Sequence, residues 1–91
     1  MIIEQIGEPA VLEQLAEECA ELCQVALKKA RILRKENPTP KKLDEVQENF
    51  IEEIADVLNC IHILVSAKDY EEIQKIGMCK LVRWENRLKR G

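Results

Sequence analysis

Hydrophobic residues recur at intervals of three and four along most of the chain, with polar residues between them. Such spacing puts the hydrophobic residues on one face of an α-helix. The first stretch begins after Gly7-Glu8-Pro9, where Pro9 suits a first helical turn because no amide hydrogen is needed there. It predicts a helix of about 25 residues that ends among basic side chains, as the helix dipole favours. Its apolar positions are Leu12, Leu15, Cys19, Leu22, Cys23, Ala26, Ala30 and Leu33.

A proline-containing segment, residues 37–40, interrupts this pattern, because proline cannot continue a helix. Thr39 is expected to cap a second helix, and Pro40 to lie in its first turn. This second helix is predicted from about residue 41 to about residue 66. The hydrophobic positions that define it are Leu43, Val46, Phe50, Ile54, Val57, Leu58, Ile61, Leu64 and Val65.

A third helical pattern occupies the C-terminal part of the chain. Asp69 and Glu72 have the spacing of a capping box, so this helix is expected to open at Asp69 and to continue toward Lys89. Gly77 weakens it somewhat. No strand pattern is present, and the short N-terminal segment is not assigned. The sequence therefore predicts one all-α domain over residues 1–91, an antiparallel helical bundle of two long helices plus a third helix, completed by oligomerisation.

Composition limits how such a bundle builds its core. The chain has 91 residues, of which 46% are hydrophobic and only 3% aromatic, so aliphatic side chains must form the core. A domain of this size buries a modest fraction of its surface. The apolar arc of the first helix also spans about half of its circumference, which is more than one neighbouring helix covers. A homodimer or homotetramer is therefore expected.

The charge pattern restricts the partners. The net charge is −3, which argues against a nucleic-acid-binding protein. Acidic residues crowd positions 13–21 and 44–56, whereas basic residues cluster at 28–35 and 80–90. No apolar run is long enough to cross a membrane, and the N-terminus lacks the basic region of a signal peptide. We expect a cytoplasmic protein that does not associate with membranes.

Four cysteines raise the possibility of zinc or disulfides: Cys19, Cys23, Cys60 and Cys79. No CxxC pair is present, and the one histidine, His62, lies two residues from Cys60 and so on another side of its helix. A cytoplasmic location would keep the thiols reduced. We therefore expect buried small hydrophobic residues rather than metal ligands.

Two pairs of acidic residues have a spacing that suits a metal site. Glu18 and Glu21 lie on the first helix, and Glu53 and Asp56 on the second; these are called the four acids below. Residues three apart stand on the same side of a helix. If Leu15, Cys19, Leu22 and Ala26 form the centre of the first buried face, Glu18 lies about 90° from that centre and Glu21 about 150°. The four acids thus border apolar surface.

Antiparallel packing of the two helices would bring the four acids together. Carboxylates that close repel one another unless a cation neutralises them. Ligation by oxygen alone favours Mg²⁺ or Mn²⁺, and Mg²⁺ commonly shares its coordination with substrate phosphates. The alternative is that these residues only favour the helix dipole or solubility. Spacing alone leaves both interpretations open.

Two segments, LAEECAELCQVALKKAR and FIEEIADVLNCIHIL, carry E-x-x-E on one helix and E-x-x-D on the next. With this paired signature, the chain resembles the MazG-like branch of the all-α NTP pyrophosphohydrolase superfamily over about residues 10–88. The superfamily includes dimeric dUTPases, dCTP pyrophosphatases and phosphoribosyl-ATP pyrophosphohydrolase. ADVLNC stands where the last of these has an "ADLLYH"-type pattern, which disfavours its substrate.

The resemblance implies an enzyme whose four acids are catalytic and bind Mg²⁺, with Mn²⁺ as an alternative. It implies hydrolysis of an NTP or dNTP to the monophosphate and pyrophosphate. One of the four acids, or neighbouring Glu17, would take the proton from the attacking water. The base and the sugar of the substrate are not indicated.

Further residues are candidates to contact the substrate. The resemblance suggests that basic residues of the third helix, Lys80, Arg83 and Arg87, hold phosphates; otherwise they are a solvated helix end. Gln14 and Asn59 are candidates to line the same cleft, because each lies about one turn from one of the four acids. Trp84 is expected to be a packing anchor rather than a base-stacking residue. The rival to an enzyme is a non-catalytic helical module that self-associates.

Overall fold

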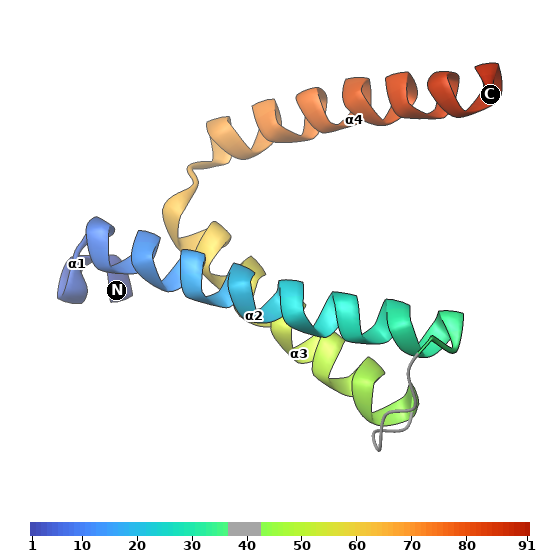
Figure 1. Cartoon of the computed structure of the whole chain (residues 1–91). Coiled ribbons are helices and arrows are strands. Elements are labelled where there is room, and N and C mark those ends of the chain that lie inside the picture. The colour runs from blue at the N-terminus through green and yellow to red at the C-terminus, as the bar shows by residue number, and fades with distance from the viewer. Residues whose placement is uncertain (37–42) are drawn as a thin grey trace.

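The computed structural model describes residues 1–36 and 43–91, and within these ranges all regular structure is helical (Figure 1). The helices are α1 (Ile2–Ile6), α2 (Glu8–Arg34), α3 (Leu43–Leu64) and α4 (Ala67–Arg90). The all-α class and the two long antiparallel helices are confirmed. The expected cap at Thr39 and the helix start near residue 41 lie outside the described residues.

Local signals place the ends of α2 close to where the sequence predicts them. Gly7 precedes the helix at φ 88°, a left-handed conformation that glycine adopts readily, and Pro9 lies in the first turn. The helix ends at Lys35, whose φ of 59° turns the chain away. The Lys35 amide donates a hydrogen bond to the carbonyl of Ile32 (3.1 Å), and the Glu36 amide donates to that of Arg31 (3.1 Å). These bonds satisfy carbonyls that the helix end leaves free.

The start of α4 differs from the prediction. The helix begins at Ala67, not Asp69, and its N-cap is Ser66, whose Oγ accepts a hydrogen bond from the Asp69 amide (3.1 Å). The predicted capping box of Asp69 with Glu72 is therefore wrong. A serine hydroxyl reaches the amide three residues on, and Ser66 is the first residue after α3 able to do so. Helix α3 ends at Leu64, two residues before the expected end.

The core lies along the line where α2 and α3 pack. On α2 the least exposed residues step by four and three from Val11 through Leu15 and Leu22 to Val25. Among the described residues, the buried side chains are Val11, Val46, Val57 and Cys60. This packed line is called the seam below.

The seam corrects the predicted face of the first helix. It is rotated by roughly 60° from the predicted centre, since it follows Val11 and Val25 rather than Cys19 and Ala26. Leu12 and Leu33, expected in the core, are 49% and 59% exposed. The prediction that the cysteines are buried holds for Cys60 and is wrong in this chain for the other three, which are exposed; all four are free thiols.

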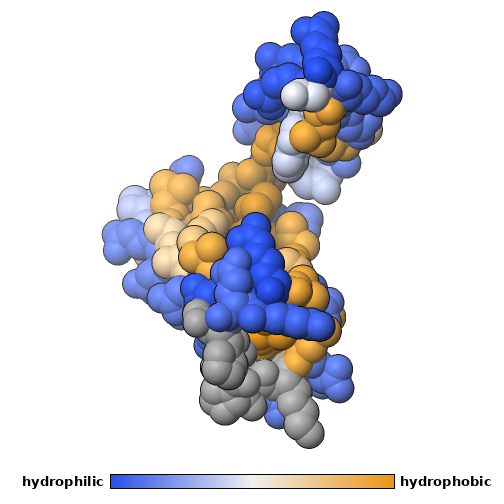
Figure 2. Space-filling view, turned by 45° about the vertical axis from the view of Figure 1, so that its right-hand side comes forward, coloured by the Kyte–Doolittle hydropathy of each residue, from blue (hydrophilic) through white to orange (hydrophobic). Residues whose placement is uncertain are grey.

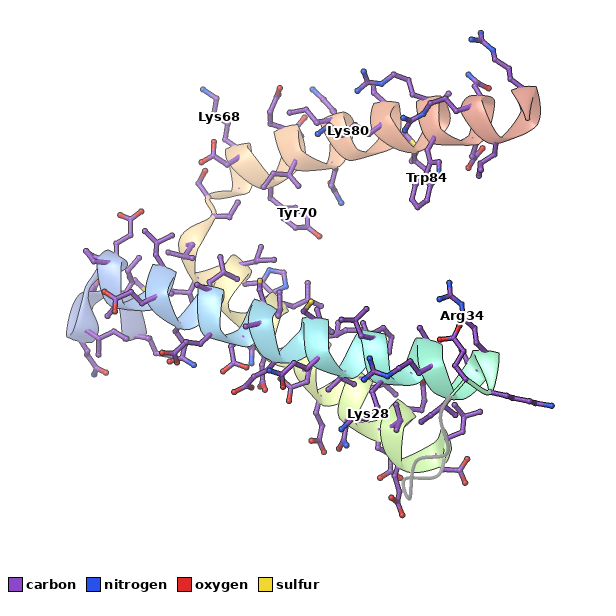
Figure 3. The ribbon with its side chains drawn as sticks, viewed as in Figure 1. Lys28, Arg34, Lys68, Tyr70, Lys80 and Trp84 are labelled. Atoms are coloured by element: carbon purple, nitrogen blue, oxygen red, sulfur yellow. The ribbon has the colours of Figure 1, made fainter. Side chains whose placement is uncertain are left out.

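Helix α4 projects away from the other helices (Figures 1 and 3). Each of its residues is exposed, and within the described residues it packs on neither α2 nor α3 beyond the junction. At that junction the rings of His62 and Tyr70 are tilted, with centroids 6.1 Å apart. Trp84 is 58% exposed, so it is not the packing anchor that was expected within one copy.

The molecule is consequently open in shape (Figure 2). Its radius of gyration is 16.8 Å, whereas a compact domain of this length has about 12 Å. An extended shape of this kind is consistent with assembly of several copies. None of the described helices joins sufficient length to sufficient apolarity to span a lipid bilayer.

Candidate metal centre

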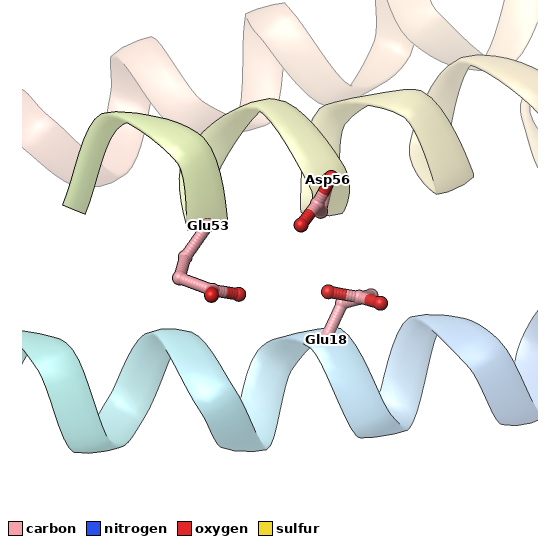
Figure 4. A group of neighbouring side chains, drawn as sticks. All are labelled: Glu18, Glu53 and Asp56. Carbon is pink, nitrogen blue, oxygen red and sulfur yellow. The ribbon is translucent and has the colours of Figure 1, made fainter. Parts of the chain in front are cut away.

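Three of the four acids meet between α2 and α3 (Figure 4). Glu18 comes from α2, and Glu53 and Asp56 come from α3. Each contributes a carboxylate oxygen, and these oxygens all lie within 4.8 Å of one another. The group is called the acidic triad below. Its geometry allows a shared cation, as the spacing of the acids predicted.

Two members of the triad lie in the seam. Glu18 continues the series of Leu15 and Leu22, and Glu53 lies between the partly buried Phe50 and the buried Val57. These are positions that apolar side chains fill elsewhere along the same line. Their acids are partly buried, whereas Asp56 is exposed. The packing of α2 against α3 thus holds two carboxylates partly out of contact with water.

One oxygen of each seam carboxylate has lost its contact with water. Within the described residues, Glu18 Oε2 and Glu53 Oε2 are shielded and have no hydrogen-bond partner. A shielded carboxylate oxygen without a partner is costly. A cation bound between the two helices would satisfy both oxygens, and a set of carboxylates alone fits a hard divalent ion such as Mg²⁺.

Gln14 positions one of these carboxylates. Its Nε2 donates a 2.7 Å hydrogen bond to Oε1 of Glu18, one turn further along α2. The bond holds the Glu18 side chain at Oε1 and leaves the shielded Oε2 without a partner. The structure thus places Gln14 beside the site, as its spacing predicted, and gives it a partner within the protein.

The electrostatics of the site disfavour charge. Desolvation, followed by the negative charge of Glu21, raises the pKa of Glu53. At Glu18 the bond from Gln14 lowers the pKa, but desolvation and the charges of Glu21 and Asp56 outweigh it, so the pKa of Glu18 is raised. Without a cation, Glu18 and Glu53 therefore resist ionisation.

Glu21 lies at the edge of this group. It is exposed and is not among the oxygens within 4.8 Å of one another. Its charge nevertheless contributes to raising the pKa values of Glu18 and Glu53. Cys60, one turn after Asp56 and buried, borders the same group: desolvation and the charge of Glu18 raise the pKa of its thiol.

The basic residues predicted to hold phosphates are not brought to the triad within one copy, whereas Asn59 stands one turn after Asp56. Asn59 is exposed on α3. Lys80, Arg83 and Arg87 line one edge of α4 with Arg90, and α4 does not pack on α2 or α3. In the part of the chain that the structure describes, no ion pair joins these basic residues to an acid.

The position of Glu18 in the seam was not recognised from the sequence. The signal was present, because Val11, Leu15, Leu22 and Val25 follow an alternation of four and three that includes residue 18. The predicted buried face did not include Glu18 because Leu12, Cys19 and Cys23 are apolar and also follow helical spacing, on a neighbouring side of α2.

No family model, curated protein or solved structure matches this chain.

Proposed function

We propose that this chain is a MazG-like nucleoside triphosphate pyrophosphohydrolase that depends on Mg²⁺. The observation that supports this most is the acidic triad, with two seam carboxylates that each have a shielded oxygen without a partner. An acid at a core position destabilises the helix pair unless something binds there. The paired E-x-x-E and E-x-x-D signature then suggests which chemistry the bound ion serves.

The residues present fit a hard divalent cation. Glu18, Glu53 and Asp56 would hold it, and Glu21, exposed at the edge of this group, is the candidate for a further ligand. When bound, Mg²⁺ polarises phosphoryl oxygens, lowers the pKa of water and neutralises the charge that develops on the leaving group. Gln14 keeps Glu18 oriented for this role.

The proposed reaction is hydrolysis between the α- and β-phosphates. The oxygen of a water molecule bonds to the α-phosphorus, and the bond from that phosphorus to the bridging oxygen breaks. The bond electrons leave with pyrophosphate, and the nucleoside monophosphate remains. The proton of the water passes to a carboxylate, for which the exposed acids Asp56 and Glu21 are better placed than the shielded oxygens of the seam.

A substrate panel tests the proposal. The purified protein is incubated with each NTP and dNTP and Mg²⁺, and the products are separated by ion-exchange chromatography. Monophosphate and pyrophosphate are expected in equal amounts for at least one nucleotide, and chelation of Mg²⁺ should stop their release. Absence of turnover with every nucleotide, together with no effect of Mg²⁺ on the melting temperature, would leave the non-catalytic self-associating module as the better description.

A further inference from the structure

Apolar surface lies on both sides of the space between α4 and the α2–α3 pair. On α4, Tyr70, Ile73 and Leu81 are 40%, 49% and 46% exposed, and Trp84 and Leu88 continue the stripe. Tyr70 and Trp84 extend from α4 toward the α2–α3 pair, whereas Lys68 points the opposite way (Figure 3). Hydrophobic surface is also visible on the facing sides of the two parts (Figure 2).

The α2–α3 pair has its own uncovered apolar face. On α2 it includes the exposed residues Leu12 and Cys23, and on α3 it includes Ile51 and Leu58. On each helix these residues lie about 100–140° to one side of the seam, while the exposed acids lie to its other side. Because the helices are antiparallel, the two apolar arcs share one face of the pair. Glu21 and Asp56 open onto the opposite face.

The surface area that one copy exposes indicates that it is part of a larger assembly. The chain exposes 7582 Å², whereas a compact monomer of this mass exposes about 5400 Å². The excess, about 2000 Å² per copy, matches what obligate homodimers bury, which is about 2000–5000 Å² for both partners together. A second copy can therefore supply the missing contacts.

Charge favours the same occupant. The basic edge of α4 (Lys80, Arg83, Arg87 and Arg90) meets no acid within the described chain, and the acidic triad meets no base. A second copy offers each group its complement at once. A lipid surface would accept the α4 stripe and its bases but would leave the acids unbalanced.

We propose that two copies form an interlocked dimer, called the clasp below. In the clasp, the α2–α3 pair of each copy lies between α4 and the α2–α3 pair of the other copy. The apolar arcs of the two pairs then pack together. The acid-bearing face of each pair turns toward the other copy's α4. On that face, Val25 of α2 and Ile63 of α3 offer apolar contacts to the α4 stripe. Lys80, Arg83 and Arg87 reach the partner's triad and bind the phosphates there, so each site is shared between copies.

The assembly is tested first without reference to catalysis. Sedimentation at micromolar concentration should show a dimer or a multiple of it. Leu81→Glu places a charge in the α4 stripe and should produce monomers; Lys68→Glu, on the opposite side of α4, should not. If L81E does not fold, sedimentation and cross-linking of the wild type still test the proposal. In a mixture of ¹⁴N- and ¹⁵N-labelled copies, carbodiimide should join Lys80 to acids of α2 or α3 of the other copy. A wild-type monomer, or links only within a copy, would overturn the proposal.

The shared site, which rests on the proposed function, is tested by complementation. One variant carries Glu53→Gln, and the other replaces Lys80, Arg83 and Arg87 with alanine. Each alone should be nearly inactive. After the two are unfolded and refolded together, about a quarter of wild-type activity should return, because half of the dimers are mixed and each holds one intact site. Bases acting on their own chain's triad would restore nothing.

The two experiments separate the failures. Dimers with cross-links between copies but an inactive wild type would refute the hydrolase and keep the clasp. An active wild type without complementation would keep the hydrolase and refute the shared site. Monomers that bind anionic vesicles through α4 would refute the clasp in favour of a membrane surface.

Discussion

Glu53 occupies a seam position between two partly or fully buried neighbours, Phe50 and Val57. An aliphatic residue there would stabilise the helix pair more, so a carboxylate at this position indicates a function rather than a contribution to packing. The same holds for Glu18, which also has a shielded oxygen without a partner. Substitution of either residue alone therefore tests whether it serves a function.

Glu53→Gln removes one negative charge and keeps the shape of the side chain. We expect the metal-free variant to melt higher than wild type, because repulsion among the acids falls, and to lose its stabilisation by Mg²⁺. Activity should fall by about 100-fold or more. Differential scanning fluorimetry and a pyrophosphate assay measure both. Glu52→Gln, the same change at the exposed neighbour, serves as the control. Undiminished activity of E53Q would refute the metal assignment.

The raised pKa values of Glu18 and Glu53 predict how stability depends on pH. Between the ordinary value of 4.5 and the raised values, the folded state binds more protons than the unfolded state, so metal-free stability should rise as pH falls through this window. Mg²⁺ competes with those protons, so its stabilising effect should shrink over the same window. Urea unfolding at several pH values measures both trends. A wild type whose pH profile equals that of E53Q would contradict this prediction.

Gln14→Ala removes the hydrogen bond that lowers the pKa of Glu18. The carboxylate then holds its proton more strongly and is less well oriented. We expect Mg²⁺ affinity to fall by about 10-fold, the lower end for a residue that positions a ligand. Isothermal titration calorimetry measures the affinity, and Gln24→Ala, at another exposed position of α2, is the control. Equal affinities for the two variants would argue against a positioning role.

At the scale of elements, the packing of α2 on α3 decides which acids meet. The alternation of four and three along both helices sets an antiparallel seam, and the triad forms where both helices have acids in or beside it. Helix α4 contributes nothing to this seam within one copy. Its start is nevertheless locally determined and can be tested separately.

Ser66→Ala should fray the first turn of α4, because the Asp69 amide loses its acceptor. The expected cost is about 1 kcal/mol, confined to that turn. Amide hydrogen exchange of residues 67–70 should quicken, while exchange along the seam stays unchanged. Glu72→Ala tests the capping box that the sequence predicted and should have little effect. A larger effect from E72A than from S66A would reverse the assignment of the cap.

At the scale of the whole molecule, the buried core of one copy is small. The described residues with buried side chains are few and lie along the seam, while many large hydrophobic side chains stay exposed. A core of this size leaves little margin over the conformational entropy lost by the chain on folding. The stability of the fold should therefore depend on association.

The melting temperature of the wild type should accordingly rise with protein concentration, as mass action requires when folding and association are coupled. The L81E variant should melt lower and independently of concentration. Calorimetry over a hundredfold range of concentration, about 1 to 100 μM, is sufficient to detect the trend. A wild type whose melting temperature is constant over that range would show that a single copy is stable by itself.

Several features were determined by the sequence alone. The period of the hydrophobic residues predicted the all-α class, because helical periodicity is a local property. Gly7 and Pro9 marked the start of α2, because their backbone preferences act within one turn. The i,i+3 spacing of the acids indicated an acidic group, since residues three apart share a helix face whatever the surroundings.

Only the tertiary structure decided which face of each helix is buried. Helix α2 has two apolar arcs, and its sequence does not say which one meets α3, because both follow helical spacing. The choice of the arc with Val11 and Val25 placed Glu18 in the seam and left Leu12 and Cys23 exposed. The tertiary structure also keeps Lys80 and Arg83 of α4 apart from the acids that they were expected to accompany. Contacts between residues far apart in the sequence depend on how helices pack and not on their period.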